Sequence, residues 1–346
     1  KIHDFKETQS VTEFEGRRMQ SEIMGAAGFW GFSPVTIKQV ANAITAWGVS
    51  HVVPHGIFMT RKLSGNPWLP DWYEYNPMWP YLHLWNDFVR RASFVNSHGH
   101  TVPDLLLVSP MDSVWALSGP GAFDPTLQGR VPGPPVMPLQ TPDDIDQSRE
   151  ALKKNSAWWC PPTMDDWFCD EVKHINRVYS QAMLDLADAR IEYLIADRHY
   201  IQQMKVESGR LTRAEFSFKT VVLPPVTVLP LAVAERIAAF ARSGGQVYAL
   251  GTLPSGSTDQ GMNDPAMRAL MKKLRACKTF TSCPDSLKAD IQQGSPGLVS
   301  RIRFKSGAFA MIQQQRRIDQ QDFFWLANNT GKAQDCGIVL DNIRGD

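Results

Sequence analysis

The chain has 346 residues, of which 43% are hydrophobic and 21% are charged. This is the composition of an ordinary folded, water-soluble protein with room for two or three domains. Lys and Arg number 36 and Asp and Glu 35, which leaves a formal charge of +1. That balance gives no support to a nucleic-acid or anionic-membrane partner. No apolar run reaches the ~20 residues that a membrane-spanning helix needs, so we expect no membrane span.

Strand-like and helix-like segments alternate through the first hundred residues. The apolar pattern predicts strands at 17–24 and 49–54 and helices at 35–47 and 80–97. Such alternation is typical of a (β/α)8 barrel, in which functional residues lie at the carboxyl ends of the strands. We interpret residues 1–100 as the final strands and helices of a barrel, that is, the C-terminal part of a catalytic (TIM) barrel domain.

Two polar side chains end the predicted strands of this segment. Glu22 closes the first strand beside a Gly-rich loop, and His55 follows the second strand. Because both end parallel strands one βα unit apart, we expect them at the same rim. Glu22 is the candidate catalytic carboxylate, and His55 is a candidate for bonding a sugar hydroxyl. A solvated Glu and a structural His are the plainer alternatives.

A stretch rich in aromatic residues and proline separates the second strand from the second helix. Seven large rings fall within eighteen residues: Trp68, Trp72, Tyr73, Tyr75, Trp79, Tyr81 and Trp85. Aromatic faces stack on the apolar faces of sugars, so we interpret the stretch as a carbohydrate-binding loop, with core packing as the alternative. The candidate substrate-binding residues in it are Trp68, Asp71, Trp72, Tyr73, Glu74 and Asn76.

Residues 101–285 continue the alternation with more strongly buried strand patterns. Strands are predicted at 104–109, 192–195, 220–223 and 246–250, and helices at 172–188 and 232–242. This order predicts a doubly wound parallel sheet of the flavodoxin-like kind. The Gly- and Pro-rich stretch 119–142 is expected to be an exposed loop.

The last segment, residues 286–346, lacks long helical periodicity. Alternating patterns at 298–304, 308–313, 322–328 and 337–340 predict antiparallel strands. We interpret this segment as β-rich, the incomplete opening of a β-sandwich.

Five cysteines leave the redox state open. Cys160 and Cys169 are close in sequence, as are Cys277 and Cys283, which permits two local disulfides in an oxidising compartment; buried thiols are the alternative. The chain opens with Lys1 in ordinary folded sequence, without an initiator Met or a signal peptide. We therefore expect that an N-terminal portion of the protein precedes it.

Several short segments keep a characteristic order along the chain. They are Ser21-Glu22, residues 49–56 (VSHVVPHG), Asn76 with Trp79, Asp104 to Leu107 with Pro110 and Trp115, residues 220–224 with Gly244-Gly245, and Asp322 to Phe324 with Asn328-Asn329. In order and spacing, the chain resembles the α-L-rhamnosidases of glycoside hydrolase family 106. It departs from them at Asp112, which stands one place earlier than the corresponding Asp of the family.

The resemblance implies a (β/α)8 barrel that cleaves terminal α-L-rhamnosides with inversion and holds calcium in the sugar site. A barrel needs roughly 250 residues, so only its last two strands would lie here, with remaining barrel sequence or a companion chain supplying the others. Glycoside hydrolysis uses two carboxyl groups. Glu22 would be the general base, the acid would lie on an earlier strand, and Asp71 and Glu74 would bind sugar hydroxyls or calcium. A role in polysaccharide degradation outside the cytoplasm, periplasmic or extracellular, is implied.

Two other functions stay open at this point. The chain fits another barrel glycosidase, such as a β-galactosidase with a flavodoxin-like trimerisation domain. It also fits a non-catalytic carbohydrate-binding or scaffold remnant, because half of the catalytic pair is expected elsewhere.

Overall fold

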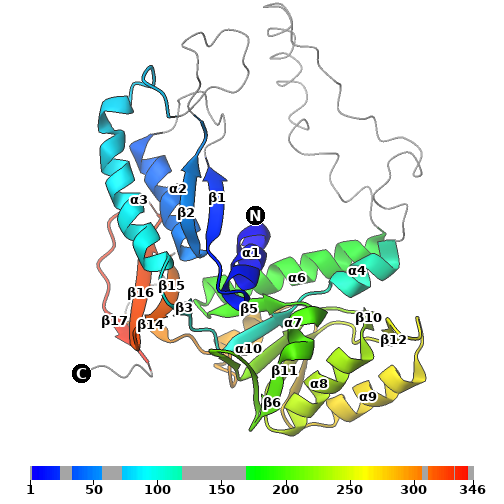
Figure 1. Ribbon diagram of the computed structural model, residues 1–346. Helices are drawn as coiled ribbons and strands as arrows, with labels where there is room; N and C mark the ends of the chain where they lie inside the picture. The colour runs from blue at the N-terminus through cyan, green and yellow to red at the C-terminus, as the bar shows by residue number, and fades with distance from the viewer. Residues whose placement is uncertain are drawn as a thin grey trace, which may run out of the picture.

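The computed structural model describes residues 2–23, 33–56, 72–118, 169–305, 311–330 and 332–341. An N-terminal strand–helix–strand–helix unit stands above a five-stranded sheet flanked by helices, and a set of antiparallel strands lies beside both (Figure 1). None of the described helices is long and apolar enough to cross a membrane.

The five-stranded sheet is entirely parallel. Its strands are β4 (Leu105–Val108), β5 (Tyr193–Ala196), β9 (Thr220–Leu223), β11 (Gln246–Leu250) and β13 (Phe280–Cys283). In space they lie in the order β5–β4–β9–β11–β13. Numbered along the chain this order is 2-1-3-4-5, the order of flavodoxin-like sheets. The predicted parallel α/β sheet is therefore confirmed.

Helices cover both faces of this sheet because its strands are apolar on both sides. Leu105 and Leu107 of β4 point to one face, where they pack with α6 (Asp170–Asp188). Leu106 and Val108 point to the other face, which α8 (Leu231–Arg242) and α9 (Pro265–Arg275) cover. Figure 1 shows α6 on the opposite side of the sheet from α8 and α9. The result is a three-layer α/β region with a core on each face.

Short elements connect the strands of this region. They are α4 (Met111–Ser118), α7 (Arg198–Gln203), the antiparallel strands β6 (Lys205–Glu207), β7 (Arg210–Arg213) and β8 (Phe216–Phe218), the paired β10 (Val228–Leu229) and β12 (Gly256–Ser257), and α10 (Lys288–Gln292). The sequence patterns did not predict these strands, because runs of two to four residues carry too little periodicity.

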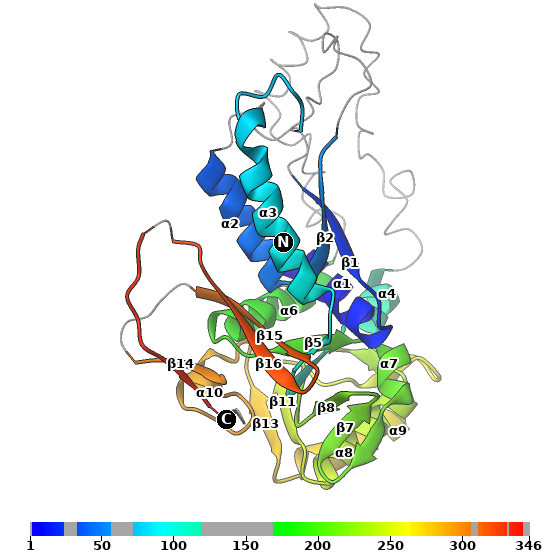
Figure 2. The same cartoon turned by 60° about the vertical axis from the view of Figure 1, so that its left-hand side comes forward.

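The N-terminal unit follows the predicted order of strand, helix, strand and helix. Its elements are β1 (Met19–Ile23), α2 (Pro34–Ala46), β2 (Val49–Pro54) and α3 (Leu82–Asn96), the last preceded by the 3-10 turn η2 (Trp79–Tyr81). The strands pair in parallel, and α2 and α3 lie against them (Figures 1 and 2). Local signals explain α2, which has a Ser33 cap and Pro34 at its first turn. The described residues contain no closed sheet, so the barrel stays a prediction.

An unpredicted helix, α1 (Ile2–Phe14), precedes β1 and packs on β5, an edge strand of the five-stranded sheet. Its buried face is polar, with Lys6, Gln9 and Ser10 all buried. Ser10 Oγ accepts a 2.8 Å hydrogen bond from the Ile195 amide and so covers part of the exposed edge of β5. Apolar periodicity could not reveal this helix, because three of the four described side chains that it buries are polar and only Phe14, at its end, is apolar.

The C-terminal strands are antiparallel, as predicted. They are β14 (Ile302–Phe304), β15 (Met311–Ile318), β16 (Gln321–Asn328) and β17 (Ile338–Leu340), which form the pairs β14–β17 and β15–β16. Asp319 and Gln320 link β15 to β16 with φ of 48° and 67°, the left-handed conformation of a tight hairpin turn. β15 also pairs with β3 (His100–Thr101), which joins this segment to the end of the N-terminal unit.

Three side chains or pairs add detail to this picture. The apolar Phe94 of α3 is 65% exposed. His100 is half-buried in β3. Cys277 and Cys283 are free thiols, and burial raises the pKa of Cys283 to about 12, which keeps it protonated and unreactive. Cys160 and the stretch 119–142 lie outside the described residues.

Candidate functional site

The carboxylate of Glu22 and the imidazole of His55 lie side by side at the carboxyl end of the β1–β2 pair. Glu22 Oε1 and His55 Nδ1 are 2.9 Å apart. The backbone fixes this contact, because Glu22 lies opposite Val53 in the parallel register and the His55 amide donates to the Ile23 carbonyl at 2.9 Å. The structure thus brings together the two residues that the sequence placed at one rim.

The two side chains differ in their access to solvent. Glu22 is 63% exposed, whereas His55 is 22% exposed. The second ring nitrogen of His55, Nε2, is buried and has no hydrogen-bond partner within the described part of the chain. When Nδ1 donates its proton to the carboxylate, Nε2 is an acceptor. The arrangement is an open carboxylate held in one orientation by an imidazole, which suits proton transfer with water or a bond to a hydroxyl.

The described part of the aromatic stretch before α3, residues 72–81, lies at the same end of the β1–β2 pair as Glu22 and His55 (Figure 1). Two of its candidate rings, Trp72 and Tyr73, are buried. Trp72 packs between α2 and α3, in contact with Ile37 and Leu82 and with its ring centroid 4.8 Å from that of Trp85. In contrast, Tyr75 and Trp79 are exposed. Trp68 and Asp71 lie outside the described residues.

The two polar candidates of the stretch have different surroundings. Asn76 is buried, and its Oδ1 accepts a 2.9 Å hydrogen bond from the Met78 amide. Its own amide donates to the Tyr73 carbonyl at 2.9 Å. Asn76 therefore shapes the turn that leads into α3. Glu74 is exposed on the same turn.

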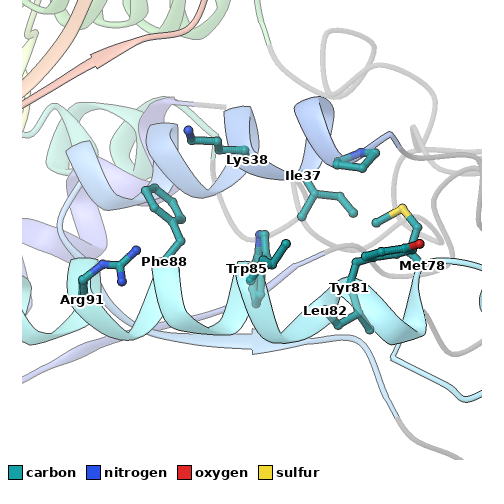
Figure 3. A pocket seen from close by; sticks show the side chains of 10 residues that line it. Ile37, Lys38, Met78, Tyr81, Leu82, Trp85, Phe88 and Arg91 are labelled. Atoms are coloured by element: carbon teal, nitrogen blue, oxygen red, sulfur yellow. The ribbon is translucent and has the colours of Figure 1, made fainter.

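A groove of about 510 Å³ runs between α2 and α3, close to the buried Trp72. Figure 3 shows Ile37 of α2 pointing towards Leu82 and Trp85 of α3. The Lys38 amine lies 5.6 Å from the centroid of the Phe88 ring, at one end of the groove. The sequence analysis did not predict this groove. The apolar residues at the start of α3, which include the exposed Tyr81 and Leu84, could have indicated it.

A calcium site was expected from the family resemblance. Within the described ranges, no three carboxylate, His or Cys side chains converge as metal ligands. Ca²⁺ takes six to eight oxygen ligands, and the Glu22–His55 pair supplies one carboxylate. Bound calcium therefore stays a prediction of the resemblance, and we assign no step to the ion.

The described residues form a mixed α/β protein that is built on a parallel sheet. No known family model matches the sequence, and no curated protein matches it. Among solved structures, the chain is similar to the rhamnosidase from Novosphingobium sp. PP1Y, with a TM-score of 0.58 and 15% sequence identity. The likeness covers 94% of this chain but 27% of the rhamnosidase, so the chain spans about a quarter of that protein. At this identity it shows a rhamnosidase-like fold.

Proposed function

We propose that this chain is part of a glycoside hydrolase that removes terminal α-L-rhamnosyl groups with inversion, with Glu22 as the general base. The observation that carries the proposal is the open Glu22 carboxylate, held by His55 at the carboxyl end of a parallel strand. In βα folds this end of the strands carries the chemistry. The similarity to a rhamnosidase fold and the family 106 pattern around Glu22 and His55 support the same substrate class.

In this proposal each residue of the pair has one task. An inverting base takes a proton from the attacking water while an acid on the opposite face protonates the leaving oxygen, at a carboxyl separation of roughly 6.5–9.5 Å. Glu22 accepts the proton from water, and its exposure gives water access. His55 Nδ1 bonds one carboxylate oxygen and leaves the other for water. The general acid belongs to the remaining barrel sequence or a companion chain.

The same proposal divides the chain into three parts. Residues 1–100 form the C-terminal part of a (β/α)8 barrel, 101–285 a flavodoxin-like domain, and 286–346 a β-rich segment. β1 and β2 pair only with each other among the described strands, so each has an edge on which further barrel strands can pair. A sugar-binding role for the aromatic stretch, bound calcium, polysaccharide degradation and a periplasmic or extracellular location stay predictions of the resemblance.

The decisive test is Glu22→Gln in the protein that carries this chain, assayed on an activated aryl α-L-rhamnoside. Gln keeps the shape but cannot take a proton, so turnover should fall by about 10²–10⁴-fold. Azide, which attacks without needing a base, should give a glycosyl azide of inverted configuration. Glu235→Gln, exposed on α8, is the matched control and should leave turnover unchanged.

Three results would contradict the proposal. Near-normal turnover of Glu22→Gln would remove Glu22 from the chemistry. A product of retained configuration would favour another barrel glycosidase, such as one that cleaves β-galactosides. Sugar binding without any turnover in the wild-type protein would favour a non-catalytic carbohydrate-binding role.

A further inference from the structure

A second hollow lies away from Glu22 and His55, at the carboxyl edge of the five-stranded sheet. Its volume is about 500 Å³, and its floor is formed by Ser109 and Ile195, at the ends of β4 and β5. Helices α1, α4 and α7 supply the walls (Figure 1). Open α/β sheets bind their ligands at this edge, whereas Glu22 and His55 end strands of the separate β1–β2 sheet.

One wall combines an ion pair with a partly exposed indole. Asp112 Oδ1 lies 3.0 Å from Arg198 Nη1; the Asp112 side chain is 7% exposed and that of Arg198 is 46% exposed. The Arg198 guanidinium lies over the Trp115 ring, 5.8 Å from its centroid. Trp115 is itself 52% exposed and shares this side of α4 with Met111, one turn before it. A carboxylate, a guanidinium and an indole thus meet in one hollow.

The charges of the hollow disfavour an anionic ligand. Among the described residues, three carboxylates, those of Glu7, Asp112 and Asp197, line it together with one guanidinium, and His199 adds at most one positive charge. The net charge is therefore negative, which repels phosphate.

The neighbouring crevice between β4 and β9, where the strand order reverses, is already closed. Ser113 Oγ accepts hydrogen bonds from the amides of Thr227 and Val228 at 3.0 and 3.1 Å and donates to the Val228 carbonyl at 2.9 Å. These amides would otherwise be available to a phosphate group. A nucleotide or flavin site of the usual switch-point kind is thus occupied by the protein itself.

We propose that the hollow binds a neutral sugar, with the apolar face of the ring on Trp115 and two neighbouring hydroxyls on Asp112 and Arg198. One hydroxyl donates to the carboxylate and the next accepts from the guanidinium, so a vicinal diol matches the ion pair without adding charge. Indole offers the apolar surface that a pyranose face needs. This sugar site does not depend on the proposed hydrolysis, because a protein without catalytic activity could bind a sugar here in the same way.

The surroundings of Asp112 support this assignment. Burial raises the pKa of its carboxyl, and the nearby Arg198 only partly offsets that shift. A hydroxyl donor from a ligand would stabilise the ionised form of this carboxyl.

The test is a titration of the 346-residue chain with methyl α-L-rhamnoside and D-galactose, followed through the indole N–H signal of Trp115 in nitrogen-labelled protein. Inorganic phosphate and flavin mononucleotide are the anionic comparisons. We expect at least one of the two sugars to shift this signal saturably, and neither anion to do so. The signal is assigned by its loss in Trp115→Phe, and Glu22→Gln should leave the titration unchanged because that residue lies at the other site.

Calorimetry of variants tests whether the sugar binds in the hollow or at another surface. Trp115→Ala should weaken binding at least tenfold, and because Trp115 is largely exposed this change spares the core. Asp112→Asn, which keeps the shape, should also weaken it. Phe94→Ala, at another exposed aromatic position, on α3, should have no effect. No saturable shift with either sugar up to its solubility limit, an unchanged affinity in Trp115→Ala, or tighter binding of phosphate than of sugar would each overturn the proposal.

Discussion

The five-stranded sheet and the β1–β2 pair are both parallel, yet their surroundings are opposite. β4 has a partner on each side, and its four residues are buried with their side chains in cores on both faces. β1 and β2 have only each other among the strands that the structure describes. β2 ends in partly exposed residues, and Glu22, the residue before the last of β1, has a carboxylate open to solvent.

This difference separates stability from function. A strand that is covered on both faces and both edges contributes to folding and leaves nothing free for chemistry. The β1–β2 pair instead rests on a small core that includes Met19, Ile44 and Val49. It presents polar groups at its end, and a buried His55 nitrogen there has no partner among the described residues. We expect the first region to set global stability and the second to open locally at lower cost.

A pair of leucine substitutions tests this contrast most directly. Leu106→Ala removes a fully buried side chain from the middle of the sheet and should lower the free energy of unfolding by about 3–5 kcal/mol. Leu82→Ala lies beside the α2–α3 groove, where solvent can fill the space, so its cost should be nearer 2 kcal/mol. Urea unfolding measures both changes. Equal losses, or a larger loss for Leu82→Ala, would show that the two regions form one cooperative core.

The closed crevice between β4 and β9 gives a smaller effect. Ser113→Ala leaves the buried amides of Thr227 and Val228 without their acceptor, which should cost about 1–3 kcal/mol. Thr8→Ala is the control, because Thr8 is exposed on α1 and its hydroxyl donates to the Asp4 carbonyl of the same helix. The change there should stay within about 0.5 kcal/mol. Similar values for the two variants would mean that Ser113 does not hold the crevice closed.

The sequence predicted those elements whose pattern comes from apolar burial. Strands β2, β9 and β11 have the predicted bounds, because each is a run of buried or β-branched residues that ends at a Pro or Gly. Glu22 and His55 were predicted to lie at one rim, since residues that end adjacent parallel strands share an edge, and the structure places their side chains 2.9 Å apart.

The features that the sequence did not predict depend on polar contacts or on contacts between residues far apart in the chain. Helix α1 buries Lys6 beside Tyr193, with its amine 4.5 Å from the ring centroid, a contact across almost two hundred residues. The Asp112–Arg198 pair likewise joins residues far apart in the chain. Trp72 was interpreted as a substrate-binding ring but is buried. Composition alone does not distinguish an aromatic ring in a core from one on a surface.

The smallest expected effect is a pH dependence of the free energy of unfolding. It arises at β3, between the β1–β2 unit and the five-stranded sheet. His100 of β3 pairs with Arg317 of β15 and packs edge-on to Phe216, with ring centroids 5.8 Å apart. Burial lowers the pKa of His100 below the usual 6.5, and Arg317 and Arg316 act in the same direction, while Glu215 and Glu13 oppose it.

As pH falls below 6.5, the unfolded chain therefore takes up a proton at His100 before the folded protein does. Stability should then fall with pH, at no more than about 1.4 kcal/mol per pH unit because a single proton is involved. Above that pH, His100 is neutral in both states and contributes nothing to the slope. His100→Gln, which cannot titrate, should flatten the slope of unfolding free energy between about pH 5 and 6.5, relative to the wild-type chain in the same buffers. His98→Gln is the control, because His98 lies exposed two residues earlier and should leave the slope as it is. An unchanged slope in His100→Gln would place the acid sensitivity of the fold in other groups.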